Sequence, residues 1–456
     1  MALRRILIAN RGEIALRVIR ACRDLGVESV QAHSTADANT LPVQLADSAI
    51  EIGEAQATES YLKGDRIIEA AKQVGADAIH PGYGFLSESA AFSDKCAAAG
   101  ITFIGPKGSV IDLMGNKAAA RAMAMKAGVP VTPGSKDPIS GFNDAVKIAG
   151  EIGYPLLIKA SAGGGGRGMR VVESEEKLKE TLESASHEAA SAFGNGEVYI
   201  EKYLSDVRHV EVQVFGDGKK TLQFGERDCS VQRRHQKLLE ESPSPAVSPE
   251  LREKMVTAAC ALGDAVGYEG AGTVEFIVDA ATQTFYFIEM NTRIQVEHPV
   301  TEEVTRVDLV KRQILQAGGN APELRQEDIN PQGHSIECRI NAEDPEKGFM
   351  PKPGKIETFV LPSGPGIRVD THIYPGYQLP PYYDSLLAKV IATGSNREEA
   401  LARMRRALGE MRVEGVPTTI SFHQRLLNDP VFLEGRVHTR YIRDVMYAGH
   451  RMQQML

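Results

Sequence analysis

The sequence has few cysteines and no long apolar run. Its five cysteines are odd in number and show no Cys-x-x-Cys spacing, which indicates reduced thiols in a cytoplasmic protein. No stretch approaches the length that spans a membrane. The apolar run 6–9, between Arg5 and Arg11, is too short for a signal peptide. We therefore expect no membrane association.

The chain also lacks an excess of positive charge. Lys and Arg number 52 against 60 Asp and Glu, a net charge of −8, which argues against nucleic acid as the main partner. The 456 residues, 42% hydrophobic and 25% charged, are typical of a globular protein with roughly two or three domains. Local basic clusters must therefore have local roles.

Two common nucleotide-binding fingerprints are missing. Roughly the first 110 residues alternate short apolar runs with helical patterns, which predicts a doubly wound parallel sheet. Neither residues 10–13 nor residues 82–85 supply the three glycines of a dinucleotide-binding turn. The glycine-rich residues 159–170 lack the Gly-Lys-Ser/Thr ending of a Walker loop and instead predict a hairpin loop, whose backbone N–H groups can approach phosphate. A flexible loop has the same composition, so this pattern needs support from its neighbours.

Polar residues alternate after the apolar run 285–288. In an extended segment alternate residues share one face, so these side chains should converge: Glu289, Asn291, Arg293, Gln295 and Glu297. Carboxylates, amides and a guanidinium in one small volume could hold a divalent cation and recognise a small anion, as phosphoryl transfer requires. A solvated polar strand is the alternative.

A second strand-like run, residues 273–278, predicts a hairpin with the first through the turn 279–284. In that hairpin Glu275 should stand opposite Glu289, and two facing carboxylates repel each other unless they share a cation. Together with Asn291 they offer the hard oxygen ligands of Mg²⁺ rather than a zinc site.

Four long motifs carry a resemblance to a known family: Lys159 with the glycine loop, 201–204, 232–237 and 289–298. They resemble those of biotin carboxylases of the ATP-grasp superfamily, and the similarity extends from Ile8 to at least Ser385. The resemblance implies an α/β chain with an ATP-grasp fold. It would comprise an N-terminal doubly wound parallel-sheet domain (1–114), an ATP-grasp domain (115–320) with a small lid (135–203), and a C-terminal α+β domain (335–447).

The same resemblance implies the residues that bind each substrate. ATP would be held by Lys117, Lys159, Gly164, Gly165, Gly166, Met169, Glu201, Lys202, Tyr203, Leu204, His209, Gln232, His235, Glu275 and Glu289. Bicarbonate would be held by Lys237, Arg293, Gln295, Val296, Glu297 and Arg339. Mg²⁺ or Mn²⁺ would lie at Glu275, Glu289 and Asn291.

Biotin would contact Tyr83 and Arg339, with Glu88 nearby, although ordinary loop positions are equally open for Tyr83 and Glu88. The catalytic set would be Lys237, Arg293, Glu297 and Arg339. A buried structural salt bridge is the alternative for Arg339.

The implied activity is ATP- and bicarbonate-dependent carboxylation of biotin N1′ through carboxyphosphate. Residues 122–127 superficially resemble a biotin attachment sequence, but Lys126 precedes Ala and closes a predicted helix, 117–126. With no room for a carrier domain after residue 447, biotin should arrive on a separate biotin carboxyl carrier protein, with carboxyltransferase subunits as further partners. The family commonly forms homodimers.

The final acceptor is not fixed by the sequence. Acetyl-CoA carboxylase in fatty acid synthesis is favoured, and another acyl-CoA or pyruvate carboxylase is the alternative. Two other functions stay open: an ATP-grasp carboxylase or ligase that activates a different acid, and a nucleotide-binding regulatory subunit without catalysis.

Overall fold

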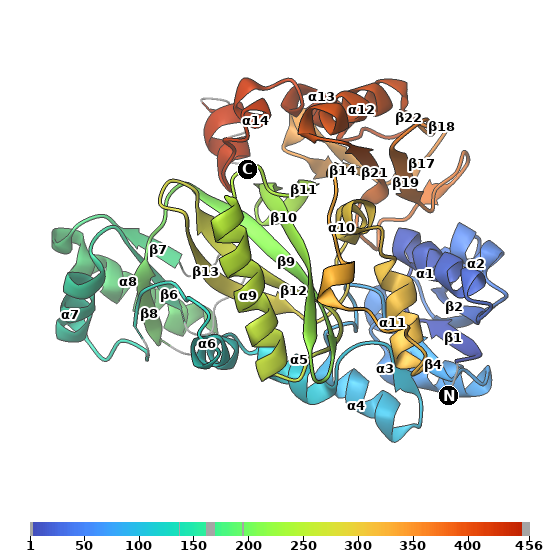
Figure 1. The fold of residues 1–456 in the computed structure, drawn as a ribbon, viewed down its shortest axis with the longest axis horizontal. Helices are drawn as coiled ribbons and strands as arrows, with labels where there is room; N and C mark the ends of the chain where they lie inside the picture. Colours follow the sequence, from blue (N-terminus) through green and yellow to red (C-terminus); the bar gives the residue numbers. More distant parts are fainter. Residues whose placement is uncertain (1–2, 136, 161–168, 194–195, 449–456) are drawn as a thin grey trace.

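A computed structural model describes residues 3–135, 137–160, 169–193 and 196–448. An N-terminal layered unit, a small outlying sheet and a large central sheet follow one another along the chain, and the C-terminal region extends the central sheet (Figure 1). Within those ranges, none of the helices has the length and apolarity needed to cross a membrane.

The N-terminal unit is the predicted doubly wound parallel sheet. Its strands lie in the order β3-β2-β1-β4-β5 and all pair in parallel: β1 (Arg5–Ile8), β2 (Glu28–Ser34), β3 (Ser48–Gly53), β4 (Ala78–His80) and β5 (Thr102–Phe103). Edge strand β3 was not predicted, and most of its side chains are at least partly exposed.

Helices cover both faces of this sheet because successive side chains of β1 point in opposite directions. Ile6 and Ile8 pack with α1 (Gly12–Asp24) and α11 (Leu309–Ala317), whereas Leu7 faces a core under α3 (Gly64–Gln73) and α4 (Ala90–Ala98). Short helix α2 (Leu41–Leu45) lies against α1. Because α1 packs against the sheet and α11, Glu13 in its first turn is buried.

The outlying sheet holds the flanks of the glycine-rich loop. It has the order β7-β6-β8, with β6 (Leu156–Ala160), β7 (Met169–Val172) and β8 (Val198–Lys202), and packs on α7 (Phe142–Ile152) and α8 (Glu175–Phe193). Lys159 pairs with Met169 across antiparallel β6 and β7, so these two strands form the predicted hairpin. The loop between them, including Gly164, Gly165 and Gly166, lies outside the described residues.

The central antiparallel sheet has the order β13-β12-β9-β10-β11-β14-β21-β19. Its strands are β9 (Val207–Asp217), β10 (Thr221–Arg233), β11 (Gln236–Ser242), β12 (Glu269–Asp279), β13 (Thr284–Asn291), β14 (His334–Asn341), β19 (Ile367–Thr371) and β21 (Leu386–Gly394). One face packs on α5 (Gly108–Gly115), α6 (Lys117–Lys126) and α9 (Pro249–Ala265).

Strand β9 shows how this sheet separates core from site. Val210, Val212 and Val214 belong to the apolar core with α9, and the intervening His209, Glu211 and Gln213 point to the opposite face. The opposite face of the sheet therefore carries polar side chains that are largely buried.

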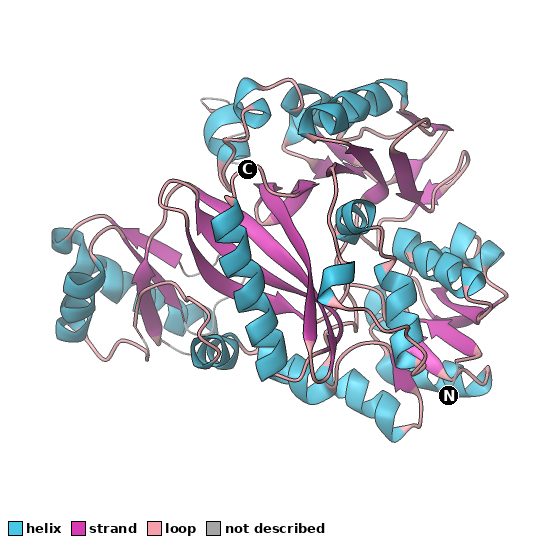
Figure 2. Ribbon diagram, viewed as in Figure 1, coloured by secondary structure: helices cyan, strands magenta, loops and turns pink. Residues whose placement is uncertain are grey.

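The C-terminal region joins β14, β19 and β21 to helices above the sheet (Figure 2). These helices are α12 (Arg397–Glu410), α13 (Ile420–Leu426) and α14 (Pro430–Leu433), and α10 (His298–Thr305) bridges back to the central strands. Two short strands, β17 (Gly354–Lys355) and β18 (Thr358–Val360), also belong to this region.

Candidate active site

The hairpin of β12 and β13 has the predicted register, with Glu275 directly opposite Glu289. The prediction of one extended segment through Glu297 is wrong beyond Asn291, where β13 ends. Residues 292–297 form a turning segment, since Pro299 lies in the first turn of α10 and Glu297 is its N-cap. Arg293, Gln295 and Glu297 nevertheless reach one site, because the segment folds back over the sheet.

Lys237 on β11 is the centre of this site. Its Nζ lies 2.6 Å from a Glu211 oxygen, 3.0 Å from Glu275, 2.6 Å from Glu297 and 3.1 Å from Gln295 Oε1. Burial alone would lower the pKa of this ammonium, but the surrounding carboxylates hold it well above its ordinary value. Lys237 is therefore a fixed positive charge.

Glu211 contacts Lys237, and Arg227 in turn contacts Glu211. Neither residue was predicted from the sequence. Arg227 is fully buried; its Nε lies 2.6 Å from Glu211, and its other nitrogens donate to Gln213, Thr273 and Thr301. The alternation of His209, Glu211 and Gln213 with valines in β9 is the sequence signal that could have revealed this layer.

Glu297 contacts two cations, Lys237 and Arg339. One oxygen accepts from Lys237 and the other lies 2.9 Å from an Arg339 nitrogen. Burial opposes its charge, yet Lys237 and Arg339 hold the pKa of Glu297 below its ordinary value. Glu297 is thus a carboxylate whose basicity is suppressed while both cations remain on it.

Arg339 on β14 also pairs with Glu240 on β11, through its Nε at 2.6 Å. Burial raises the pKa of Glu240 to about 7, although Arg339 acts in the opposite direction. Arg339 therefore forms a buried salt bridge with Glu240, which is the structural role considered above, and it also contacts Glu297. The two descriptions are compatible.

Arg293 lies at the edge of the same cluster. Its Nε donates to Glu88 at 2.9 Å and another nitrogen donates to Asn291 Oδ1 at 2.8 Å. The backbone N–H of Thr292 binds the same Glu88 carboxylate at 3.0 Å. Glu88, in a loop of the N-terminal unit, thus joins that unit to the segment after β13.

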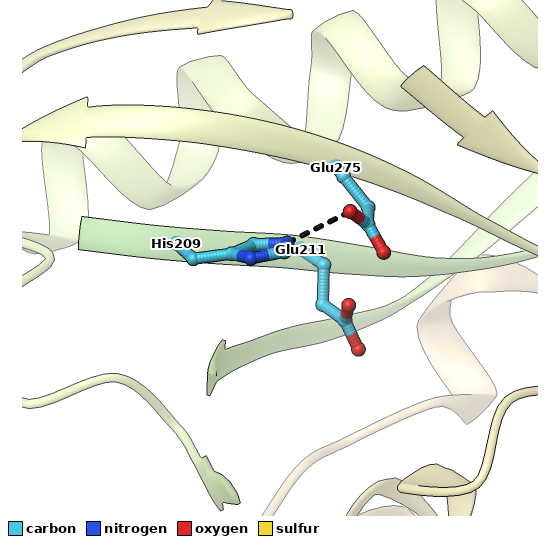
Figure 3. Close-up of side chains that lie close together, drawn as sticks. All are labelled: His209, Glu211 and Glu275. Carbon is cyan, nitrogen blue, oxygen red and sulfur yellow. Dashed lines mark ion pairs between the residues drawn. The ribbon is translucent and has the colours of Figure 1, made fainter. Parts of the chain in front are cut away.

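Two groups of side chains in the described part of the chain have metal-like spacing. His209, Glu211 and Glu275 have ligand atoms within 4.8 Å of one another, and Figure 3 shows His209 pointing to Glu275, from which it lies 2.9 Å away. Lys237 already contacts both of these carboxylates, so its ammonium group occupies the position that a metal ion would need. The second group, Glu211, Cys229 and Glu297, also lies around Lys237, and burial raises the pKa of the Cys229 thiol well above its ordinary value.

The pair Glu275 and Glu289, with Asn291 beside it, fits a divalent cation better. Asn291 Nδ2 lies 2.9 Å from Glu275 Oε1. Burial and then the charge of Glu275 raise the pKa of Glu289, whereas Lys117 lowers it. An oxygen-rich pair with uncompensated repulsion is the donor set that Mg²⁺ prefers.

Three predicted nucleotide-binding residues, Lys159, Glu201 and Lys202, lie on strands of the outlying sheet. Lys159 on β6 forms an ion pair with Glu201 on β8, and Lys202 donates to the carbonyls of Gly153 and Tyr154. Tyr203 and Leu204 follow β8 and line a hollow of about 510 Å³. This hollow is large enough for a heterocyclic base.

Other predicted nucleotide residues take varied positions. Gln232 Nε2 lies 3.5 Å from His209 Nδ1, and Met169 is exposed at the start of β7. Lys117 is exposed at the first turn of α6. His235 is exposed in the turn between β10 and β11, and none of the contacts described for the cluster involves it. Its role in nucleotide binding stays a prediction.

Tyr83 lines a smaller cavity of about 160 Å³ beside α1, together with Glu13, His372 and Asp384. Its hydroxyl donates to Glu13, and burial followed by the Glu13 charge raises its pKa well above the ordinary value. Glu13 was not singled out from the sequence, because its partner is 70 positions away.

Comparisons with known proteins match nearly the whole chain. Family models describe residues 2–111 as a biotin carboxylase N-terminal domain, 116–324 as the ATP-binding domain of the carbamoyl-phosphate synthase L chain, and 337–444 as a biotin carboxylase C-terminal domain. Biotin carboxylase 1 of Bacillus subtilis is 55% identical, covering 97% of this chain and 99% of that protein. A pyruvate carboxylase subunit from Methanothermobacter thermautotrophicus is 53% identical, covering 96% and 89%.

A solved structure shows the same similarity. The biotin carboxylase domain of Hydrogenobacter thermophilus 2-oxoglutarate carboxylase, a dimer in complex with MgADP, ADP and bicarbonate, superposes with a TM-score of 0.89. It is 48% identical, and the match covers 98% of this chain and 99% of that one. The fold, the sequence and the polar site thus agree with one group of proteins.

Proposed function

The chain belongs to the biotin carboxylase family, has its ATP-grasp α/β fold and is an ATP-dependent carboxylase, and from this premise we propose how its residues act. ATP lies with its base in the hollow beside Tyr203 and Leu204, and its phosphates extend toward Lys159 and Lys117. Glu275, Glu289 and Asn291 hold Mg²⁺, which would supply charge neutralisation at the transferring phosphoryl group.

Bicarbonate is held by Lys237, Arg293 and Gln295, the backbone of Val296, and Arg339. The observation that carries this proposal is that Glu297 lies between Lys237 and Arg339, at 2.6 Å and 2.9 Å. An entering anion draws these cations toward itself, and the pKa of Glu297 then rises because less positive charge stabilises its carboxylate. Glu297 can therefore accept a proton only once its substrate is in place.

Two chemical steps follow. Bicarbonate, deprotonated by Glu297, attacks the γ-phosphate and yields carboxyphosphate and ADP. Carboxyphosphate breaks down to CO₂ and phosphate, and the phosphate removes the proton from biotin N1′. Arg339 stabilises the negative charge that develops on the ureido oxygen, and N1′ attacks CO₂. Tyr83 forms a wall of the biotin cavity.

The decisive experiment measures ADP release by the purified protein with Mg-ATP, bicarbonate and free biotin. We expect ADP release that requires bicarbonate and is increased by biotin, with carboxybiotin as the product. Release that depends on another carboxylic acid would favour a different ATP-grasp ligase. Binding of ATP with no turnover under any of these conditions would favour a regulatory subunit.

We propose a separate biotin carboxyl carrier protein and carboxyltransferase subunits as partners, with acetyl-CoA as the final acceptor and the cytoplasm as the location. Support comes from the B. subtilis relative, which is named as a biotin carboxylase and matches over nearly its full length. The free cysteines of the described part agree with a reducing compartment. The M. thermautotrophicus relative makes a pyruvate carboxylase the second candidate. Identification of the biotinylated protein that co-purifies, and of the acyl acceptor it carboxylates, separates the two.

A homodimer is the proposed assembly, because the H. thermophilus domain was solved as a dimer. Sedimentation of the purified chain tests this directly. A single species at the monomer mass across micromolar concentrations would contradict it.

A further inference from the structure

Lys389 on β21 is a completely buried lysine that contacts three separate parts of the fold. Its Nζ donates to the Val296 carbonyl at 2.8 Å and lies 3.0 Å from Glu13 Oε1. A third partner, Asp370 on β19, is 4.0 Å away. One ammonium thus links the C-terminal strands, the segment before α10 and the first turn of α1.

Two of the Lys389 contacts lead to different proposed substrate sites. Val296 immediately precedes Glu297, so the carbonyl that Lys389 holds belongs to the segment that carries the proposed base. Glu13 Oε1 accepts hydrogen bonds from both Lys389 and Tyr83, and Glu13 and Tyr83 line the same cavity. Lys389 also pairs with Arg339 across β14 and β21, so its backbone is fixed beside the third reacting group.

We propose that Lys389 is a positioning residue that fixes the bicarbonate-binding segment and the wall of the biotin cavity relative to each other. This inference rests on the proposed function, because it assigns bicarbonate to Val296 and biotin to Tyr83. Lys389 touches neither substrate; it acts through one backbone carbonyl and one carboxylate.

The cost of burying a charge supports a specific role for this lysine. A buried ion pair can usually be replaced by packed apolar side chains without loss of stability, so stability alone does not require an ammonium here. Only a donor can hold the Val296 carbonyl and Glu13 at the same time. Among the described residues, Glu13 Oε2 has no hydrogen-bond partner, so the orientation of this carboxylate depends on Lys389 and Tyr83.

The alternative is a purely structural role, because buried acids surround Lys389. Glu337, two residues before Arg339 on β14, is fully buried, and neither of its oxygens has a hydrogen-bond partner among the described residues. If Lys389 served only to neutralise Glu337 and Asp370, its removal would reduce the amount of folded enzyme. The remaining folded enzyme would have normal KM values for all substrates.

Three variants separate these roles: Lys389→Met, Glu13→Gln and the control Arg252→Met. The control also removes the cation of a buried carboxylate, since Arg252 lies 2.7 Å from Glu226, but Arg252 is on α9, which packs on the apolar face of the central sheet. Steady-state kinetics of each soluble variant would be measured with ATP, bicarbonate and free biotin varied in turn. Thermal unfolding would report the stability of each.

We expect Lys389→Met to lower kcat/KM for both bicarbonate and biotin by about 10²-fold, the size of effect that small misplacement of reacting groups produces. The KM for ATP should be unchanged. Glu13→Gln should raise the KM for biotin and leave the KM for bicarbonate unchanged, because Lys389 still holds Val296. Arg252→Met should lower the unfolding temperature without changing any KM.

A Lys389→Met variant that matches Arg252→Met in kcat/KM for both bicarbonate and biotin would overturn the inference. If Lys389→Met fails to fold, Glu13→Gln decides: an unchanged KM for biotin would overturn the inference equally. Failure of the proposed function has a different signature, because the wild-type protein would then release no ADP in response to bicarbonate and biotin.

Discussion

Glu275 and Glu289 lie directly opposite each other on β12 and β13, and a bulge immediately follows Glu275. Two carboxylates in this register repel each other unless a cation lies between them. Lys237 contacts Glu275 but no contact joins it to Glu289 within the described part of the chain. The repulsion between Glu289 and Glu275 is therefore one that a bound metal ion would relieve.

Glu289→Gln should accordingly abolish turnover far more than it weakens ATP binding. Loss of this carboxylate misplaces Mg²⁺ at the transferring phosphoryl group, while Lys159 and the segment from Glu201 to Leu204 still hold the nucleotide. ADP production at saturating Mg²⁺ and ATP affinity by calorimetry would be compared with the wild type. Near-normal ADP production would exclude a metal role for Glu289.

Lys237→Met should destabilise the fold strongly. It removes the shared partner of Glu211, Glu275 and Glu297 and leaves their carboxylates buried together, a change that typically costs on the order of 3–5 kcal/mol. Reversible urea unfolding would measure the free energy of unfolding. Lys311→Met, which breaks the partly exposed pair with Asp24 at 2.6 Å, is the matched control and should have little effect.

The loss caused by Lys237→Met should also depend on pH. In the wild type Lys237 holds the pKa of Glu275 well below its ordinary value despite burial, so this stabilisation is present above that ordinary value and is lost as pH falls. In the variant the buried carboxylates bind protons more readily and regain stability as pH falls. The difference between the two proteins should shrink toward acid pH, and a constant difference would contradict the central role of Lys237.

The sequence predicted the parts of the site that follow from local pattern. The hairpin register of Glu275 and Glu289 follows from two strand-like runs and one turn, and helix 117–126 follows from strong helix formers. The strand was extended too far, to Glu297, because alternation of polar residues continues past the point where Pro299 begins a helix. Alternation alone does not distinguish a strand from a segment that folds back.

The support beneath the site could not be predicted in the same way. Arg227 contacts Glu211 and Thr301, and Lys389 contacts Val296 and Glu13, across separations that only the tertiary fold creates. No local pattern marks a charged residue as fully buried, since composition favours exposure for every Lys and Arg. Resemblance identified the residues expected to contact substrates, but not the residues that hold them.

Glu241 should contribute stability that is lost in acid. It lies 2.8 Å from His334 Nε2 and 2.7 Å from Arg397 Nε. Burial opposes its charge, but these partners lower its pKa from 4.5 to about 2. Its contribution, about 3 kcal/mol, is therefore present above pH 4.5 and disappears as the pH falls to about 2.

Urea unfolding of wild type and Glu241→Gln between pH 2 and pH 7 measures this contribution. The wild type should be more stable near neutrality, and the gap should close as Glu241 becomes protonated. Glu183→Gln on an exposed position of α8 is the control and should show no pH-dependent gap. A gap that stays constant to pH 2 would show that His334 and Arg397 do not stabilise the charged form.

Arg339 and Glu297 should separate the two chemical steps, although they are in contact at 2.9 Å. Arg339→Ala should leave some bicarbonate-dependent ATP cleavage and nearly eliminate carboxybiotin, because the ureido oxygen loses its charge partner. Glu297→Gln should suppress both products, because bicarbonate is then not deprotonated. The loss expected for a group that stabilises transition-state charge is on the order of 10²–10³ in rate.

ADP and carboxybiotin would be assayed in parallel with free biotin, so that docking of a carrier protein plays no part. Arg339→Ala also leaves Glu240 buried without its cation, and the resulting loss of stability would lower both products equally. Arg339→Ala combined with Glu240→Gln corrects for this, since the buried charge is removed as well. If that double variant still couples ATP cleavage to carboxybiotin as the wild type does, Arg339 serves only as a structural partner of Glu240.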